Sequence, residues 1–168
     1  MNPVPTGMLF GSPHDLDLVI ERTFRADQDD VWASLTTSES TARWIGPWEG
    51  EPGPGKTVRL QMSFEDGAPS SDLFIEACDP PRRLVLSFKD SNGDWHFEMS
   101  LRQEGPDTVL TFKQSRLDPE MVGEVGPGWE YYLDRLCAAR SGEPMRSFDD
   151  YYPTQKPYYI EALKKLQG

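Results

Sequence analysis

The sequence has few of the residues that build disulfide frameworks, metal sites and histidine-based catalytic centres. It contains 2 cysteines and 2 histidines in 168 residues. No ligand-like residues are spaced around Cys78 or Cys137, so the pair forms neither a disulfide framework nor a zinc motif. We expect both to be small, buried, apolar residues, and we predict no metal and no cofactor.

Long apolar runs and positive charge are also scarce. No segment approaches the ~20 apolar residues of a membrane-spanning helix, and the first residues lack the basic and apolar regions of a secretory signal. Lys and Arg number 17 against 28 Asp and Glu, a formal net charge of −11. Phosphate backbones and anionic lipids repel such a chain. We therefore expect a cytoplasmic protein that binds neither nucleic acid nor membranes.

The length suits one domain with an extension, since domains commonly hold about 100–200 residues. Residues 1–15 include three prolines and two glycines without periodicity, which predicts a flexible N-terminal arm. The domain itself is expected over residues 16–142. Residues 143–168 contain four of the six tyrosines and are expected to form a tyrosine-rich C-terminal extension, with a short helix that begins at Pro157.

The first part of the domain is predicted to form a strand, two short helices and a run of further strands. Residues 16–24 read as a strand, and Asp27 then supplies the N-cap of a helix over residues 28–35. Ser38 is expected to cap a second short helix. Beyond a turn rich in proline and glycine the pattern has period two. It predicts four to five strands in antiparallel hairpins, over residues 58–64, 73–77, 84–88, 95–101 and 109–112.

The longest predicted helix follows the last strand. Asp118 and Pro119 provide an N-cap and a first-turn proline, but three glycines interrupt the segment that follows. The strong helix is therefore expected to begin at about Pro127. Apolar side chains recur with helical spacing from Trp129 onward, and Gly142 is expected to end the helix. Its apolar face must lie on the sheet.

These elements describe an α+β fold in which a curved antiparallel sheet wraps a long C-terminal helix. One helix does not fill the concave side of such a sheet, so we expect an apolar pocket between the two, of the kind that holds small ligands. The domain carries, in order, the segments TFRADQDDVWASLTTSESTARWIGP, EACDPPRRLVLSF, TVLTFKQSRL and GWEYYLDRL. Together they resemble the activator-of-heat-shock-protein-90-ATPase-like (AHSA-type) branch of the SRPBCC (START-like) superfamily.

The resemblance covers roughly residues 16–142 and implies the helix-grip (START/Bet v 1-like) fold, with two short helices after the first strand. The superfamily includes lipid carriers, aromatic-polyketide cyclases, hormone receptors and co-chaperone domains, so the shared fold transfers no single activity. The expected ligand site is the cavity between the sheet and the long helix.

Aromatic and apolar residues of the inward strand faces and the long helix are the candidates to line this cavity. They are Trp44, Trp48, Met62, Phe64, Phe88, Trp95, Phe97, Met99, Phe112, Gln114, Trp129, Tyr132 and Leu133. Tryptophan and tyrosine give a large contact area at low entropy cost, although packing of the helices on the sheet is the preferred explanation of Trp44 and Trp129. Gln114 is expected to be a polar handle at the edge of the pocket.

Residues suited to acid–base or metal chemistry are poorly placed. His14 lies in the N-terminal arm, and His96 lies on the polar face of its strand, which favours exposure to solvent. Family members often carry a histidine just before the tryptophan of the long helix, whereas proline and glycine precede Trp129 here. The aspartates in residues 27–30 are explained by helix capping. No P-loop, G-x-S-x-G or G-x-G-x-x-G motif supports nucleotide or hydrolase chemistry. No catalytic constellation is recognised.

Three functions remain open on the sequence. The leading one is a binding protein for a small apolar or aromatic molecule, with no chemistry of its own. The second is a protein-interaction or co-chaperone-like module, which the acidic charge and the tyrosine-rich extension suit; its partner is another protein or a second copy of the chain. The third is a polyketide cyclase- or hydrolase-like enzyme, which requires a buried carboxylate with a shifted pKa facing the cavity.

Overall fold

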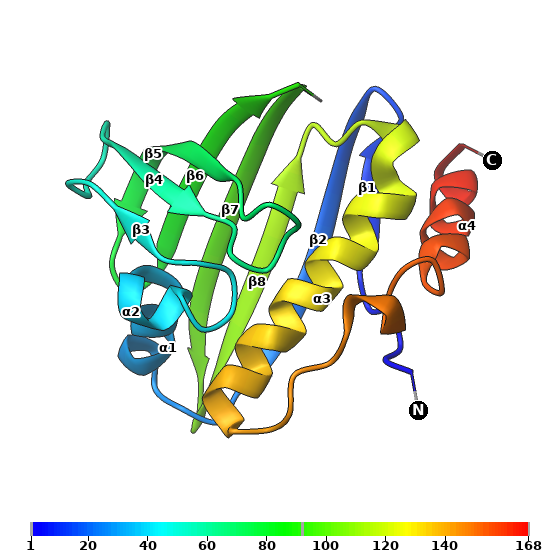
Figure 1. The fold of residues 1–168 in the computed structure, drawn as a ribbon. Helices are drawn as coiled ribbons and strands as arrows, with labels where there is room; N and C mark the ends of the chain where they lie inside the picture. Colours follow the sequence, from blue (N-terminus) through cyan, green and yellow to red (C-terminus); the bar gives the residue numbers. More distant parts are fainter. Residues whose placement is uncertain (1, 92, 168) are drawn as a thin grey trace.

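The computed structural model describes residues 2–91 and 93–167. Within them, an antiparallel sheet curves around a long helix, α3 (Val122–Ser141), on its concave side (Figure 1). The strands are β1 (Met8–Ser12), β2 (Asp15–Phe24), β3 (Trp48–Glu49), β4 (Thr57–Gln61), β5 (Ser70–Asp79), β6 (Arg83–Asp90), β7 (Gly93–Glu104) and β8 (Asp107–Ser115). The other helices are α1 (Gln28–Thr36), α2 (Ser38–Thr41), α4 (Lys156–Gln167) and two 3-10 turns, η1 (Pro119–Met121) and η2 (Phe148–Asp150).

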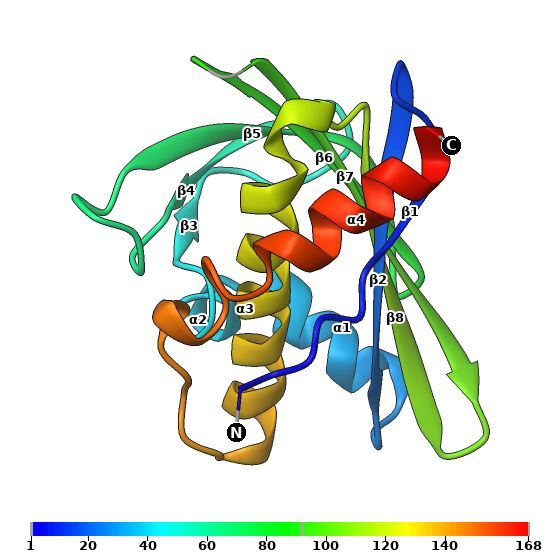
Figure 2. The same ribbon diagram turned by 90° about the vertical axis from the view of Figure 1, so that its right-hand side faces the viewer.

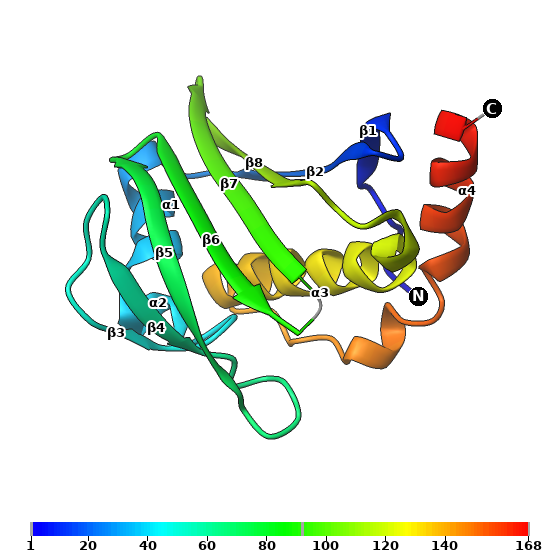
Figure 3. The same cartoon turned by 90° about the horizontal axis from the view of Figure 1, so that it is seen from above.

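The sheet order is β1-β2-β8-β7-β6-β5-β4-β3. After β2 the chain leaves the sheet, forms α1 and α2, and re-enters at the opposite edge as β3. Seen from above, α1 and α2 stand at the end of the molecule away from α4, with α3 running between the two ends (Figure 3). The α+β class, the helix-grip arrangement and the two short helices after the first long strand are confirmed.

The strands predicted from period-two patterns are confirmed as β4 to β8. Inward residues of β8 are almost fully enclosed: Leu110 is 0% and Phe112 is 1% exposed. The hairpin between β4 and β5 differs from the prediction, because β4 ends at Gln61. Phe64 therefore lies in the turn after the strand, where the alternation of inward and outward positions no longer applies.

The sequence predicts no element before residue 16, and this is wrong for Met8–Ser12, which pairs with β2 as an edge strand. In β1 only Leu9 is buried, while Met8 and Phe10 are about half exposed, at 54% and 47%. A strand with one buried residue has no readable alternation. The strand β3 was not predicted either, because two residues are too few to show an alternating pattern. The domain boundaries after residues 15 and 142 stay predictions.

Two of the predicted helix caps are confirmed, and a third is displaced by one residue. Asp27 caps α1, since its carboxylate accepts the backbone N–H of Asp30 at 2.9 Å. The cap of α2 is Thr37 rather than Ser38, which is the first residue of the helix. Gly142 ends α3 in the left-handed conformation, with φ of 76°.

Helix α3 begins at Val122, earlier than the predicted start at Pro127. Two of its glycines, Gly123 and Gly126, face α4 instead of interrupting the helix. A Cβ atom on Gly126 would lie 2.5 Å from the ring of Tyr159 on α4. The small residues therefore allow α4 to approach α3 closely. Figure 2 shows α4 crossing α3 and running beside β1, which agrees with their contacts.

Glu130 on α3 joins the two ends of the chain. Its carboxylate is 1% exposed and accepts hydrogen bonds from the hydroxyl of Tyr159 at 2.7 Å and from Arg22 on β2 at 2.9 Å. The backbone N–H groups of Thr6 and Gly7 also donate to it. We call these five residues the Glu130 cluster. Through it the N-terminal arm, β2, α3 and α4 form one packed unit.

Candidate functional site

The side chains between the sheet and α3 form a continuous aromatic cluster. Ring centroids are 4.2 Å apart for Phe112 and Trp129, and 5.0 Å apart for Phe97 and Trp129. Phe88 and Trp95 stack nearly parallel at 5.6 Å, and Phe88 lies 5.7 Å from Phe97. We call these five residues the aromatic cluster. They come from β6, β7, β8 and α3, and the concave curvature of the sheet brings them together.

The aromatic cluster contains both buried and partly exposed rings. Phe112 and Phe97 are buried, at 1% and 6% exposed. Phe88, Trp95 and Trp129 are only partly buried, although they pack against the same core. Aromatic contacts thus continue from the buried core to partly exposed rings on β6, β7 and α3. Aromatic faces in this arrangement suit stacking against a planar apolar molecule.

A polar group meets the cluster from β8. The side chain of Gln114 is buried, with the residue 2% exposed, and its Oε1 accepts a hydrogen bond from the indole Nε1–H of Trp129 at 2.9 Å. In the sheet, Gln114 lies opposite Phe97 on β7 and Leu18 on β2. An amide in apolar surroundings at the edge of the aromatic cluster is the kind of convergent polar group that orients a bound ligand.

The turn between β4 and β5 is attached to α3 by two side-chain contacts. The hydroxyl of Tyr132 donates to Glu65 Oε2 at 2.7 Å, and the Arg135 guanidinium lies 3.7 Å from the ring centroid of Phe64. Arg135 also donates from Nε to the Trp44 carbonyl at 3.0 Å. Burial, followed by the contact with Glu65, raises the pKa of Tyr132 far above its usual range, so the phenol stays protonated.

Most of the candidate residues predicted from the sequence gather along the sheet–helix interface. Trp129 and Tyr132 are neighbours on α3, with ring centroids 6.1 Å apart. Met62 packs at the margin of the same core. The structure brings together Phe88, Trp95, Phe97, Met99, Phe112, Gln114, Trp129, Tyr132 and Leu133.

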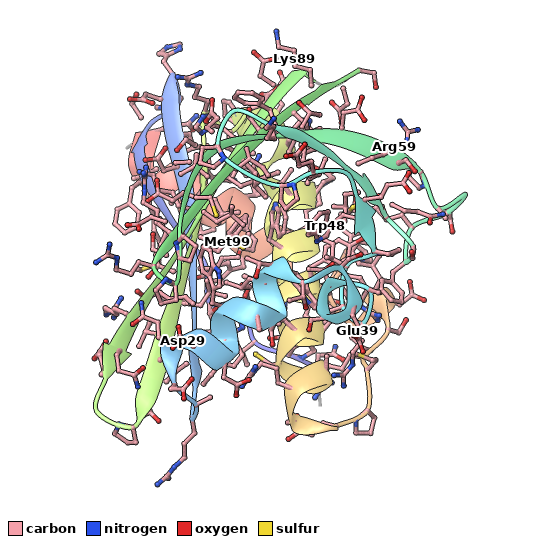
Figure 4. All side chains as sticks on the ribbon, turned by 90° about the vertical axis from the view of Figure 1, so that its left-hand side faces the viewer. Asp29, Glu39, Trp48, Arg59, Lys89 and Met99 are labelled. Carbon is pink, nitrogen blue, oxygen red and sulfur yellow. The ribbon has the colours of Figure 1, made fainter. Side chains whose placement is uncertain are left out.

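Three predicted candidates lie elsewhere. Trp44 is a core residue whose indole N–H donates to the Ser34 carbonyl at 2.9 Å. Trp48 on β3 binds the Thr36 carbonyl at 3.0 Å; Figure 4 shows it beside the short helices, far from Lys89 at the β6–β7 tip. Phe64 is 39% exposed and covers a guanidinium. The sequence did not reveal the part played by Glu65, because an exposed turn carboxylate has no pattern that marks its partner.

Two surface hollows lie away from the aromatic cluster. One, of about 170 Å³, is lined by Pro47, Trp48, Glu49, Arg59, Gln61 and Ser70. The other, of about 490 Å³, lies along α4 and is lined by Pro153, Lys156, Pro157, Ile160, Glu161 and Lys164. Both are open to solvent and combine polar and apolar side chains.

The residues weighed for acid–base and metal chemistry have ordinary structural surroundings. His96 pairs with Glu76 on the outer face of the sheet, and His14 is exposed. Cys78 and Cys137 are free and half-buried, and burial raises the pKa of Cys137 to about 11. Among the described residues, no group of three or more His, Cys, Asp or Glu side chains is arranged to hold a metal ion. No helix in the described part of the chain is long and apolar enough to cross a membrane.

Comparisons with known proteins identify a matching family and similar solved structures. A family model for Activator of Hsp90 ATPase homolog 1-like protein matches residues 25–140. CalU16 from Micromonospora echinospora is similar in structure, with a TM-score of 0.77, 23% identity and coverage of 95% of this chain and 97% of that one. EF2215 from Enterococcus faecalis, a conserved protein of unknown function, gives a TM-score of 0.74 at 19% identity, with 98% and 92% covered.

A further similar structure is DynU16, a protein in the dynemicin biosynthetic locus. Its TM-score is 0.68 at 22% identity, and the match covers 79% of this chain and 50% of DynU16. No curated protein matches the sequence. At these identities, the solved structures establish the fold.

Proposed function

We propose that this chain, which belongs to the family of Activator of Hsp90 ATPase homolog 1-like proteins, binds a small apolar or aromatic molecule between its sheet and α3. The observation that carries the proposal is the partial exposure of Phe88, Trp95 and Trp129 within an otherwise buried aromatic cluster. Leaving large aromatic surfaces in water is unfavourable, and a bound apolar molecule would cover them.

The composition of the site supports this proposal. Binding sites for small molecules combine predominantly apolar and aromatic walls with a few polar groups. Here, the walls are the aromatic cluster and the polar group is Gln114. The occurrence of DynU16 in a biosynthetic locus agrees with a role of this fold in handling small molecules. We assign no catalytic step, since the titratable side chain in ring contact with Trp129, the Tyr132 phenol, is held protonated by burial and by its hydrogen bond to Glu65.

Native mass spectrometry tests the proposal. The protein is purified gently from its own organism and measured before and after denaturation. We expect a small-molecule adduct that is lost on denaturation, and its mass identifies the ligand class. Trp129→Ala should release this adduct, whereas Trp48→Ala, which alters a half-buried tryptophan outside the cluster, should retain it. An adduct retained equally by both variants would place the ligand elsewhere.

A second candidate function is supported by exposed aromatic surface near the C-terminal extension. Phe148 is 41% and Phe64 is 39% exposed. Phe148 lies 5.2 Å from Tyr131, and the Arg135 guanidinium lies between Tyr131 and Phe64 at 5.5 and 3.7 Å from their ring centroids. Aromatic residues with arginine are typical anchors of protein interfaces. A protein partner or a second copy of the chain would then be detected as a complex whose affinity falls with Phe148→Ala.

A further inference from the structure

Gln114 occupies a position where a polar side chain needs a reason to be buried. It is on the inward face of β8, follows Leu110 and Phe112 at alternate positions, and is 2% exposed. Its neighbours across the sheet are Leu18 and Phe97, both apolar. Burying an amide without compensating hydrogen bonds is unfavourable. Each polar atom of this side chain therefore requires a partner.

The hydrogen bond from Trp129 determines which way the amide points. An indole N–H only donates, so the atom of Gln114 that faces it must be the carbonyl oxygen. The 2.9 Å contact between Trp129 Nε1 and Gln114 Oε1 satisfies this requirement. The amide NH2, with two N–H donors, must then face away from the indole. Trp129 thus removes the usual ambiguity between the two ends of a glutamine amide.

The NH2 end has no hydrogen-bond partner within residues 2–91 and 93–167. Among the described residues, Gln114 makes no hydrogen bond through Nε2, while its Oε1 is paired. In the described part of the chain, one side-chain polar atom is both completely enclosed and without a partner, namely Oε1 of Gln155 in the C-terminal extension. Nε2 of Gln114 is not such an atom and is therefore not completely enclosed. It is an oriented, unpaired donor beside the aromatic cluster.

From this geometry we infer that Gln114 selects ligands that carry a hydrogen-bond acceptor on an aromatic ring system, such as an aryl ketone or quinone carbonyl. The inference rests on the proposed function and names the ligand class of that same site. The ring system stacks on Trp129 and its aromatic neighbours, and the carbonyl oxygen accepts from Gln114 Nε2. A ligand of the same shape without the oxygen leaves this donor unpaired.

The acceptor is expected to be neutral. A carboxylate would have to give up its hydration for a single uncharged amide, and an ion pair would be needed to offset that cost. The guanidinium on the facing helix, Arg135, is engaged by the Trp44 carbonyl and the Phe64 ring. Glu65, which accepts from Tyr132, is a carboxylate and would repel an anion.

A matched pair of probes tests the inference. 9-Fluorenone and fluorene have nearly the same tricyclic shape, but only fluorenone has a carbonyl oxygen. Binding of each is measured by quenching of tryptophan fluorescence and confirmed by calorimetry. One neutral hydrogen bond should favour fluorenone by about 3- to 10-fold. The carbonyl stretch of bound fluorenone should lie at lower frequency than in cyclohexane.

Two variants assign this preference to the amide. Gln114→Met keeps the length of the side chain and removes the donor, so fluorenone and fluorene should bind equally. Trp129→Phe keeps an aromatic face but frees the amide to turn, so the ratio of the fluorenone and fluorene affinities should fall towards one. Gln61→Met, at an exposed glutamine of β4, is the control and should leave the preference unchanged. Thermal melts verify that each variant is folded.

The outcomes test the proposed aromatic site and the selective role of Gln114 separately. If neither probe binds the wild-type protein, the proposed aromatic site is contradicted. If both bind equally, or if the carbonyl stretch is unshifted, the site stands and the selective role of Gln114 is overturned. The infrared measurement uses the wild-type protein, so the inference remains testable even where Gln114→Met fails to fold.

Discussion

At the scale of single residues, Trp129 connects the stability of the core to the proposed site. Its ring lies against Phe97 and Phe112, and its N–H holds the amide of Gln114. The side chain is nevertheless partly exposed. Packing and ligand contact, which were alternative interpretations of this residue from the sequence, are therefore compatible, because the indole packs against two core rings and is also partly exposed.

Trp129→Ala should lower the free energy of unfolding by about 3 kcal/mol, because it opens a gap in the aromatic cluster and leaves Gln114 Oε1 without its donor. Trp129→Phe should cost clearly less, since most of the ring contact remains. Urea denaturation followed by circular dichroism provides the measurement. A stability of Trp129→Ala equal to that of the wild type would show that the indole contributes nothing to the core.

At the scale of elements, α3 packs against other parts of the chain on several sides. One side carries Trp129, Leu133 and Leu136 towards the sheet. Another exposes glycines to α4, and Tyr132 and Arg135 hold the turn between β4 and β5. The glycines that weaken the helical signal in the sequence are thus the residues that let α4 pack closely.

Gly126→Ala should detach or shift α4, since the added Cβ atom would lie 2.5 Å from the Tyr159 ring. We expect a loss of about 1–3 kcal/mol from overpacking, despite the higher helix propensity of alanine. Gly128→Ala in the same helix is the matched control, because nothing lies within 4 Å of its Cβ position. It should instead stabilise by up to ~1 kcal/mol. Chemical denaturation measures the change in the free energy of unfolding for both variants. Changes of the same sign would contradict close packing of α4 on Gly126.

Tyr132→Phe should loosen the turn over residues 62–69, because it removes the hydroxyl that donates to Glu65. A hydrogen bond to a carboxylate in partly exposed surroundings contributes about 1 kcal/mol. Hydrogen–deuterium exchange should show faster exchange in this turn and little change in β8. Tyr131→Phe is the control, since no hydrogen bond of the Tyr131 hydroxyl is found within the described residues. Unaltered exchange in Tyr132→Phe would indicate that the Phe64–Arg135 contact alone holds the turn.

At the scale of the whole molecule, the Glu130 cluster fastens the two ends of the chain to the central helix. Burial raises the pKa of Glu130, but hydrogen bonds from Arg22, Tyr159 and Thr6 outweigh this effect and hold the pKa below its ordinary value of 4.5. A carboxyl whose folded-state pKa is depressed stabilises the fold above its unfolded pKa. That stabilisation is lost as the pH falls through the folded pKa.

Glu130→Gln should therefore lower stability at pH 7 by about 3 kcal/mol, because Arg22 loses its buried partner. The difference from the wild type should shrink as the pH falls below 4.5, where the wild-type carboxyl becomes protonated. Glu161→Gln, at an exposed position of α4, is the matched control. Denaturation curves between pH 3 and pH 7 make the comparison, and a constant difference across this range would rule out a titrating Glu130.

The sequence by itself determined the class of fold, the strands from β4 to β8 and most of the residues that meet between sheet and helix. Residues at alternate positions, such as Leu110, Phe112 and Gln114, must share a face of a strand, and helical spacing must place Trp129 and Leu133 on one side of a helix. These relations are local and follow from the geometry of the backbone.

The tertiary structure decided what depends on partners distant in the chain. Gly126 weakens the local helical signal, and only the position of Tyr159 shows why it is there. Glu130 reads as an ordinary helical carboxylate until Arg22 and the N-terminal arm surround it. The direction of the Gln114 amide likewise depends on an indole 15 positions away. Such contacts arise when the sheet curves and brings separate elements together, and no periodicity along the chain encodes them.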